Sequence, residues 1–290
     1  MSDPFTLHEP LPALESPILV VMLTGWIDAS GAAAAAMSTL QEASVVRPLA
    51  TFDGDAFIDY RARRPTMELR DGVNTRLVWA DIELSVGHDT HGHDLLTLSG
   101  PEPDSQWRRF ADVLSSLSID LGVTKMVALG AYPFAAPHTR DPRLSTSSPS
   151  AEVVSGVAYL KNSIDVPAGM GAVLEHAFVD KGVPALGIWA QVPHYVSAMS
   201  YPAATLALLN GLHEVTGIHV DVSAIRNETI IQRQRLDQLV SGNDEHRSMV
   251  DQLEALYDSQ QESGLLGSAN IPTGDELAAE FEQFLRDQDS

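Results

Sequence analysis

"PILVVMLTGWIDASGAAAAAM", residues 17–37, contains a strand, a loop and a helix in the order that decides the fold. The unbroken apolar run at its start is typical of a strand buried on both faces, and the alanine-rich run is typical of a helix packed closely on a sheet. Similar segments recur: we expect strands at 17–23, 48–52, 94–100, 125–131 and 184–192, and helices at 30–42, 104–122 and 171–181. This alternation predicts an α/β protein, a three-layer α/β/α sandwich with a mostly parallel central sheet.

The loop at 25–31, between the first strand and the first helix, does not match a phosphate-binding sequence. Five residues separate its two glycines, an alanine stands where a P-loop has lysine, and the pattern GxGxxG is absent. Asp28 also places a carboxylate at the start of the helix, where it would repel an anion. Two interpretations stay open: either Asp28 or Ser30 caps the helix, or Trp26 and Asp28 line a pocket.

"PTMELRDGVNTRLVW", residues 65–79, interrupts this alternation of strands and helices. Two runs of alternating polarity are joined by Asp71-Gly72, a pair that supplies the positive φ angles of a type I′ turn. We therefore expect a β-hairpin inserted into the α/β core. It is either a contact between subunits or a ribbon on the surface, and the sequence does not decide between the two.

The last part of the chain, residues 226–290, is acidic and helical in pattern. It holds 14 acidic and 5 basic residues. Two apolar sets have helical spacing, namely Met249, Leu253, Leu256 and Tyr257, and Leu277, Phe281, Phe284 and Leu285. Thr273 and Glu276 form a capping-box pattern. We expect a core domain over 1–225 and a helical lid over 226–290 that packs on it.

Composition excludes several classes of partner. The 290 residues carry a net charge of -21, which repels phosphate backbones and anionic lipids, so neither nucleic acid nor membrane is expected to bind. Cysteine is absent, which excludes disulfides and thiolate catalysis. The first residues lack a secretory signal pattern, and we expect a cytoplasmic protein.

Polar and aromatic side chains gather in the segments that follow the expected strands. Ligands of open α/β sheets bind beyond the carboxyl ends of the strands. We therefore expect a ligand-binding pocket there, with the candidate residues Trp26, Asp28, Glu102, Tyr132, His138, Arg140, His194 and Tyr195.

"PHTRDPR", residues 137–143, is the most charged of these segments. Arginine recognises carboxylates and phosphates, and histidine transfers protons near neutral pH. The alternative is structural, with Arg140 paired to a carboxylate and His138 capping a carbonyl. No GxSxG sequence marks a nucleophile, so no catalytic residue is assigned and enzymatic activity stays an open question.

"GHDTHGHD", residues 87–94, has the composition of a metal site, because imidazole and carboxylate bind divalent transition metals. It precedes an expected strand, however, and so belongs at the edge of the sheet opposite the candidate pocket. We interpret it as a solvated turn. Neither a metal nor a cofactor is expected.

Five segments in order resemble the actinobacterial branch of the PAC2 family, which is named for a proteasome assembly chaperone. They are "GWIDASGAAAAA" (25–36), "YRARRP" (60–65), "GPEPDSQWRRF" (100–110), "PHTR" (137–140) and "WAQVPHYVS" (189–197). The resemblance implies a phosphorylase/hydrolase-like fold, a homotrimer formed through the hairpin at 65–79, and a C-terminal helical segment covering a ligand cleft. It carries no catalytic residues. Family chaperones dock through a hydrophobic–Tyr–X tail, and the ending "FLRDQDS" lacks that pattern.

Two functions are compatible with these features. The first is an oligomeric protein that binds a small ligand or a partner, with proteasome subunits as the candidate partner. The second is a hydrolase or transferase that acts on a small polar metabolite through His138, Arg140, Glu102 and His194.

Overall fold

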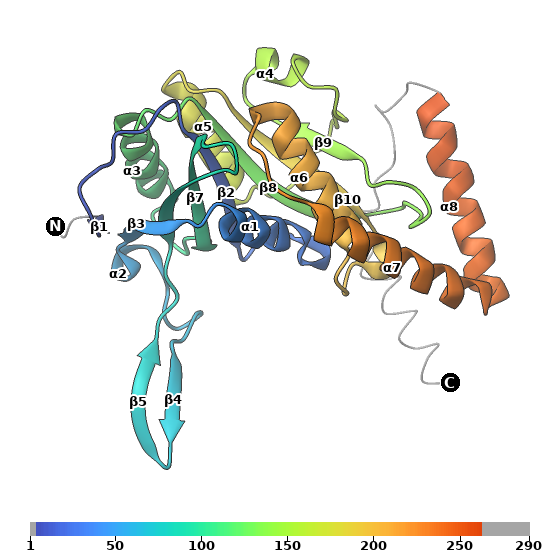
Figure 1. The fold of residues 1–290 in the computed structure, drawn as a ribbon, viewed down its shortest axis with the longest axis horizontal. Helices are drawn as coiled ribbons and strands as arrows, with labels where there is room; N and C mark the ends of the chain where they lie inside the picture. The colour runs from blue at the N-terminus through green and yellow to red at the C-terminus, as the bar shows by residue number, and fades with distance from the viewer. Residues whose placement is uncertain (1–3, 263–290) are drawn as a thin grey trace.

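The computed structural model describes residues 4–262, which form an eight-stranded sheet, helices on both of its faces and a projecting hairpin (Figure 1). The strands are β1 Phe5–Leu7, β2 Ile18–Thr24, β3 Arg47–Phe52, β4 Thr66–Arg70, β5 Val73–Val78, β6 Glu83–His88, β7 Asp94–Pro101, β8 Lys125–Phe134, β9 Leu144–Ser147 and β10 Ala185–Pro193. The α-helices are α1 Ala32–Ala43, α2 Gly54–Phe57, α3 Trp107–Asp120, α4 Ala151–Ser155, α5 Met170–Asp180, α6 Pro202–Thr216, α7 Ser223–Ser241 and α8 Asp244–Glu262. All five expected strands and all three expected core helices are confirmed.

The sheet is mixed rather than mostly parallel. Its order is β1-β3-β6-β7-β2-β8-β10-β9. The pairings of β7 with β2, β2 with β8 and β8 with β10 are parallel, and the outer four pairings are antiparallel. The difference comes from β1, β6 and β9, which the sequence did not reveal as strands. A short turn joins β6 to β7, and a connection that short permits only antiparallel pairing.

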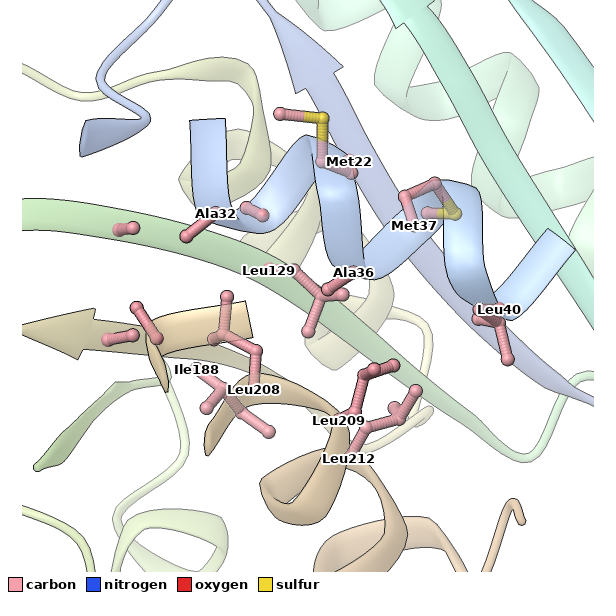
Figure 2. Close-up of a cluster of buried hydrophobic side chains, with 14 of the residues drawn as sticks. Met22, Ala32, Ala36, Met37, Leu40, Leu129, Ile188, Leu208, Leu209 and Leu212 are labelled. Carbon is pink, nitrogen blue, oxygen red and sulfur yellow. The ribbon is translucent and has the colours of Figure 1, made fainter. Parts of the chain in front are cut away.

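Two hydrophobic cores fill the space between the sheet and its helices. Val20 and Met22 of β2 belong to the core under α1 and α6, whereas Leu19 and Val21 belong to the core under α3 and α5. The central strand is therefore buried on both faces, as its unbroken apolar sequence predicts. Figure 2 shows side chains of α1 and α6 in one cluster with Leu129 of β8.

The predicted hairpin is confirmed as the β4–β5 pair, which projects from the core (Figure 1). Asp71 and Gly72 at its turn have φ angles of 50° and 81°, both positive as a type I′ turn requires. Two strands alone are marginally stable in water. The hairpin and the residue after it nevertheless expose six apolar side chains, Met67, Leu69, Val73, Leu77, Val78 and Trp79, each between 37% and 61% exposed.

The last described part of the chain is a pair of helices, α7 and α8, which we call the C-terminal helix pair. α7 begins at Ser223, before the expected boundary at 226. On α8, Val250 and Tyr257 are buried two turns apart, whereas Leu256 is 47% exposed, so the expectation that Leu256 belongs to the apolar face was wrong. Between residues 4 and 262, no helix combines the length and apolar character needed to cross a membrane. The expected capping box at 273–276 and the apolar set at 277–285 lie outside the described residues.

Candidate functional site

The loop after β2 is built around the cap of α1. The two carboxylate oxygens of Asp28 accept the backbone N–H groups of Ala33 at 2.9 Å and Ala34 at 3.0 Å. Burial raises the pKa of Asp28, and these two hydrogen bonds oppose the rise. Asp28 therefore neutralises the amino end of the helix with its own carboxylate, which is the first of the two interpretations above.

Glu102, Trp26 and Arg63 form a first cluster where β7 and β2 end. The buried Glu102 carboxylate accepts the backbone N–H of Met170, at the start of α5. The chain passes so close at Gly169 that a Cβ there would lie 2.8 Å from the Trp26 ring and 3.4 Å from Glu102 Oε1. Burial raises the pKa of Glu102, whereas the bond from Met170 and the charge of Arg63 lower it.

Arg63 was not singled out from the sequence, although it lies in "YRARRP". Its Nε donates to the Asp104 carboxylate at 3.1 Å, and its guanidinium lies against the backbone of Gly25. Trp26 itself is 45% exposed. The first cluster therefore presents an aromatic face beside a buried carboxylate and an arginine, which is a surface able to bind a small polar group.

His138, Tyr195 and His194 form a second cluster, where β8 and β10 end. Tyr195 Oη lies 2.7 Å from Nδ1 of His138 and also accepts its backbone N–H at 2.7 Å. Nε2 of His138 lies 3.2 Å from Oδ1 of Asp237 on α7, and the ring of His194 packs edge-on against Tyr195. His138 is only 3% exposed, and burial lowers its pKa although Asp237 acts in the opposite direction.

The segment 135–143, which we call the rim loop, holds the C-terminal helix pair in place. Arg140 binds the Asp258 carboxylate with two nitrogens, at 2.7 and 3.0 Å, and Glu254 lies 3.3 Å from its Nη1. The guanidinium of Arg143 stacks on the Tyr257 ring, 3.6 Å from its centroid. Arg140 therefore has the structural role that was one of the two alternatives for it, and its acidic partners belong to α8.

A third group lies on β8, β9 and β10 and was only partly expected. Tyr132 Oη lies 3.2 Å from Ser145 Oγ and accepts Nε2 of Gln191 at 3.1 Å. Gln191 is buried, and its Oε1 has no hydrogen-bond partner among the described residues. Gln191 was not a candidate, because a single glutamine in an apolar strand has no distinctive sequence pattern.

The eight candidate residues thus lie at one edge of the sheet, where the described contacts join them into separate groups. Contacts group Trp26 with Glu102, and His138 with His194 and Tyr195. Asp28 lies between the two groups, because it pairs with Ala131 in an isolated bridge, whereas Tyr132 contacts Ser145 and Gln191. A hollow of about 590 Å³ lies at the opposite edge, where Lys125 begins β8 and Pro184 precedes β10.

Comparison with solved structures identifies relatives of this fold. A Corynebacterium glutamicum protein of unknown function is 32% identical, with a TM-score of 0.82 over 89% of this chain and 98% of its own. A Mycobacterium tuberculosis protein of unknown function is 31% identical, with a TM-score of 0.81 over 92% and 94%. A proteasome-assembly chaperone homologue from Mycobacterium tuberculosis is 30% identical, with a TM-score of 0.74 over 80% and 99%.

Comparison with curated protein sequences gives no match. The PAC2 family model, in contrast, matches residues 22–240, which include β7, β8, β10, the end of β2 and all eight candidate residues. The resemblance seen in the sequence is thereby confirmed. The chain belongs to the PAC2 family.

Proposed function

We propose that this PAC2-family protein is an oligomeric binding protein with a role in proteasome assembly. In this proposal residues 1–225 form a core of the phosphorylase/hydrolase-like type, and residues 226–290 form a lid over the surface where a small ligand or a partner binds. The protein acts in the cytoplasm. The relative named as a proteasome-assembly chaperone homologue supports the choice of partner.

One observation carries this proposal: the rim groups best suited to chemistry are occupied by the C-terminal helix pair. His138 is enclosed by Tyr195 and Asp237, and Arg140 is bound by two carboxylates of α8. Groups engaged in this way are not available to a substrate while the helices stay in place. They are suited instead to holding the lid, which opens for a binding partner.

The hairpin supports an oligomer, which we propose to be a trimer. Its apolar side chains are exposed on a two-stranded ribbon that is too small to be stable alone. Burying such side chains against another copy contributes about 25 cal/mol per Å² of apolar surface. A second and third copy of the chain are the simplest partners for a surface that every copy carries.

Light scattering tests this assembly. Leu77→Asp, which places a charge among the apolar hairpin side chains, is expected to lower the mass from a trimer toward a monomer. Asn74→Asp adds the same charge at an exposed polar position of the same strand and is expected to leave the mass unchanged. A trimer that survives Leu77→Asp would remove the hairpin from the interface.

The proteasome role is tested by mixing the purified trimer with proteasome α-subunits from the same organism. We expect a complex that elutes earlier than either component in size-exclusion chromatography. If the α-subunits elute alone while the trimer is intact, the assembly role is refuted without affecting the oligomer.

A second candidate function is hydrolysis or group transfer on a small polar metabolite. The first cluster favours it, because the pKa of the buried Glu102 is raised and Trp26 beside it is accessible. A carboxyl group of this kind can act as a general acid or base. A panel of nucleosides, amino acids and amides tests it by a rise in melting temperature, followed by turnover that Glu102→Gln abolishes. No rise with any compound would count against this alternative.

A further inference from the structure

Histidines gather around the turn that joins β6 to β7, at the edge of the sheet opposite the candidate site. His91 and His93 are exposed in this turn, and His219 lies in the connection between α6 and α7. The ring of His91 stacks on that of His219, with centroids 4.4 Å apart, and His213 packs edge-on against His219 at 5.6 Å. The fold thus assembles imidazoles from segments that are far apart in the sequence.

Asp89 fixes the positions of these histidines. Its side chain is fully buried, and Oδ1 accepts the backbone N–H groups of His91 at 2.8 Å and His93 at 2.9 Å. Oδ2 accepts the backbone N–H of His219 at 2.9 Å and lies 2.8 Å from Nδ1 of the His93 ring. A carboxylate bonded to one ring nitrogen is the arrangement that orients a metal-binding imidazole in proteins.

We propose that His91 and His93, held in position by Asp89, bind a divalent transition-metal ion of the zinc or nickel class. One donor atom from each residue lies within 4.8 Å of the other two. Because Nδ1 of His93 faces Asp89, its Nε2 is left available to a metal. Imidazole nitrogens favour zinc, nickel and copper, whereas calcium and magnesium favour sites made only of oxygen.

Two further observations support a cation at this position. The net charge of -21 raises the local concentration of cations around the whole protein. His91 and His93 are exposed, so an ion reaches them without any rearrangement of the core. This site is separate from the function proposed above, and either can fail without the other.

The test uses the full chain without an affinity tag, after removal of metal with EDTA. Isothermal titration with zinc chloride is expected to show one ion bound per chain. His91→Ala and His93→Ala are each expected to weaken zinc binding by about tenfold or more. In the unaltered chain, cobalt is expected to broaden the NMR signals of the His91 and His93 rings selectively.

His176→Ala and His246→Ala are the matched controls, because they remove exposed histidines on α5 and α8. Both are expected to bind zinc as the unaltered chain does. The proposal is overturned if the unaltered chain binds no zinc, or if all four variants lose affinity equally. Should a variant of the turn fail to fold, the cobalt spectrum decides, because broadening at His176 or His246 in place of His91 and His93 would also overturn it.

Discussion

Glu175 on α5 is a buried acid, and its ionisation destabilises the folded protein. Its carboxylate is 3% exposed and faces β10, where the missing side chain of Gly187 makes room for it. It accepts one hydrogen bond, at 2.9 Å, from Ser147 Oγ on the neighbouring strand β9. Burial raises the pKa of Glu175 from 4.5 to about 7, because one hydroxyl group does not replace the water that a carboxylate loses.

The sign and size of the effect follow from this raised pKa. At a pH below the pKa that the carboxyl has in the unfolded chain, the group is protonated in both states and does not change the free energy of unfolding. As the pH rises toward the folded pKa, the unfolded chain releases the proton first, so the free energy of unfolding falls. The full difference between 4.5 and about 7 corresponds to about 3 kcal/mol. Above the folded pKa the protein carries a buried charge and the loss is complete.

Glu175→Gln removes the titration while keeping the shape of the side chain. The isoelectric point is near 4.6, so urea unfolding is best measured from about pH 5.5 to about pH 8 to avoid precipitation. Over that range we expect the stability of the variant, relative to the unaltered protein, to increase by about 2 kcal/mol. Asp180→Asn, an exposed position on the same helix, is the control and is expected to show no such increase. A difference for Glu175→Gln that stays constant with pH would refute the reasoning.

Two further predictions concern the edge of the sheet where the candidate residues lie. Asp28→Ala is expected to lower the free energy of unfolding by about 1 kcal/mol, because it removes the cap of α1. Ser30→Ala is the control and is expected to have little effect, because Ser30 Oγ has no hydrogen-bond partner among the described residues. Equal urea midpoints for the two variants would contradict this prediction. Arg140→Ala is expected to speed hydrogen exchange in α8 but not in the core strands, because it removes the paired bonds to Asp258. Arg247→Ala, which alters an exposed ion pair within α8, is the control, and an equal effect of both variants would show that the rim loop does not hold the helix.

The parts of the fold that the sequence predicts are those in which a single segment contains the necessary information. β2 is recognisable because every side chain from Leu19 to Met22 is apolar, which only a strand covered on both faces requires. The hairpin is recognisable because Asp71-Gly72 suits one kind of turn. β9, with the sequence LSTS, has no such pattern and forms because β10 offers a free edge beside it. Strands of that kind are set by their neighbours and not by their own residues.

In the candidate site, too, some features follow from a single segment and others depend on distant segments. Topology alone places the segments after β2, β7, β8 and β10 at one edge, which is why all eight candidate residues lie there. Which acids engage the rim loop is a different question, because the chain has 39 acidic residues and nothing near position 140 marks Asp258 among them. Residue type therefore predicts what a side chain can do, whereas packing decides whether it is free to do it. His138 is the clearest case: the sequence offers it as an acid–base group, but it can exchange protons with a substrate only if Asp237 and the rest of α7 move away, so chemistry at His138 depends on that movement.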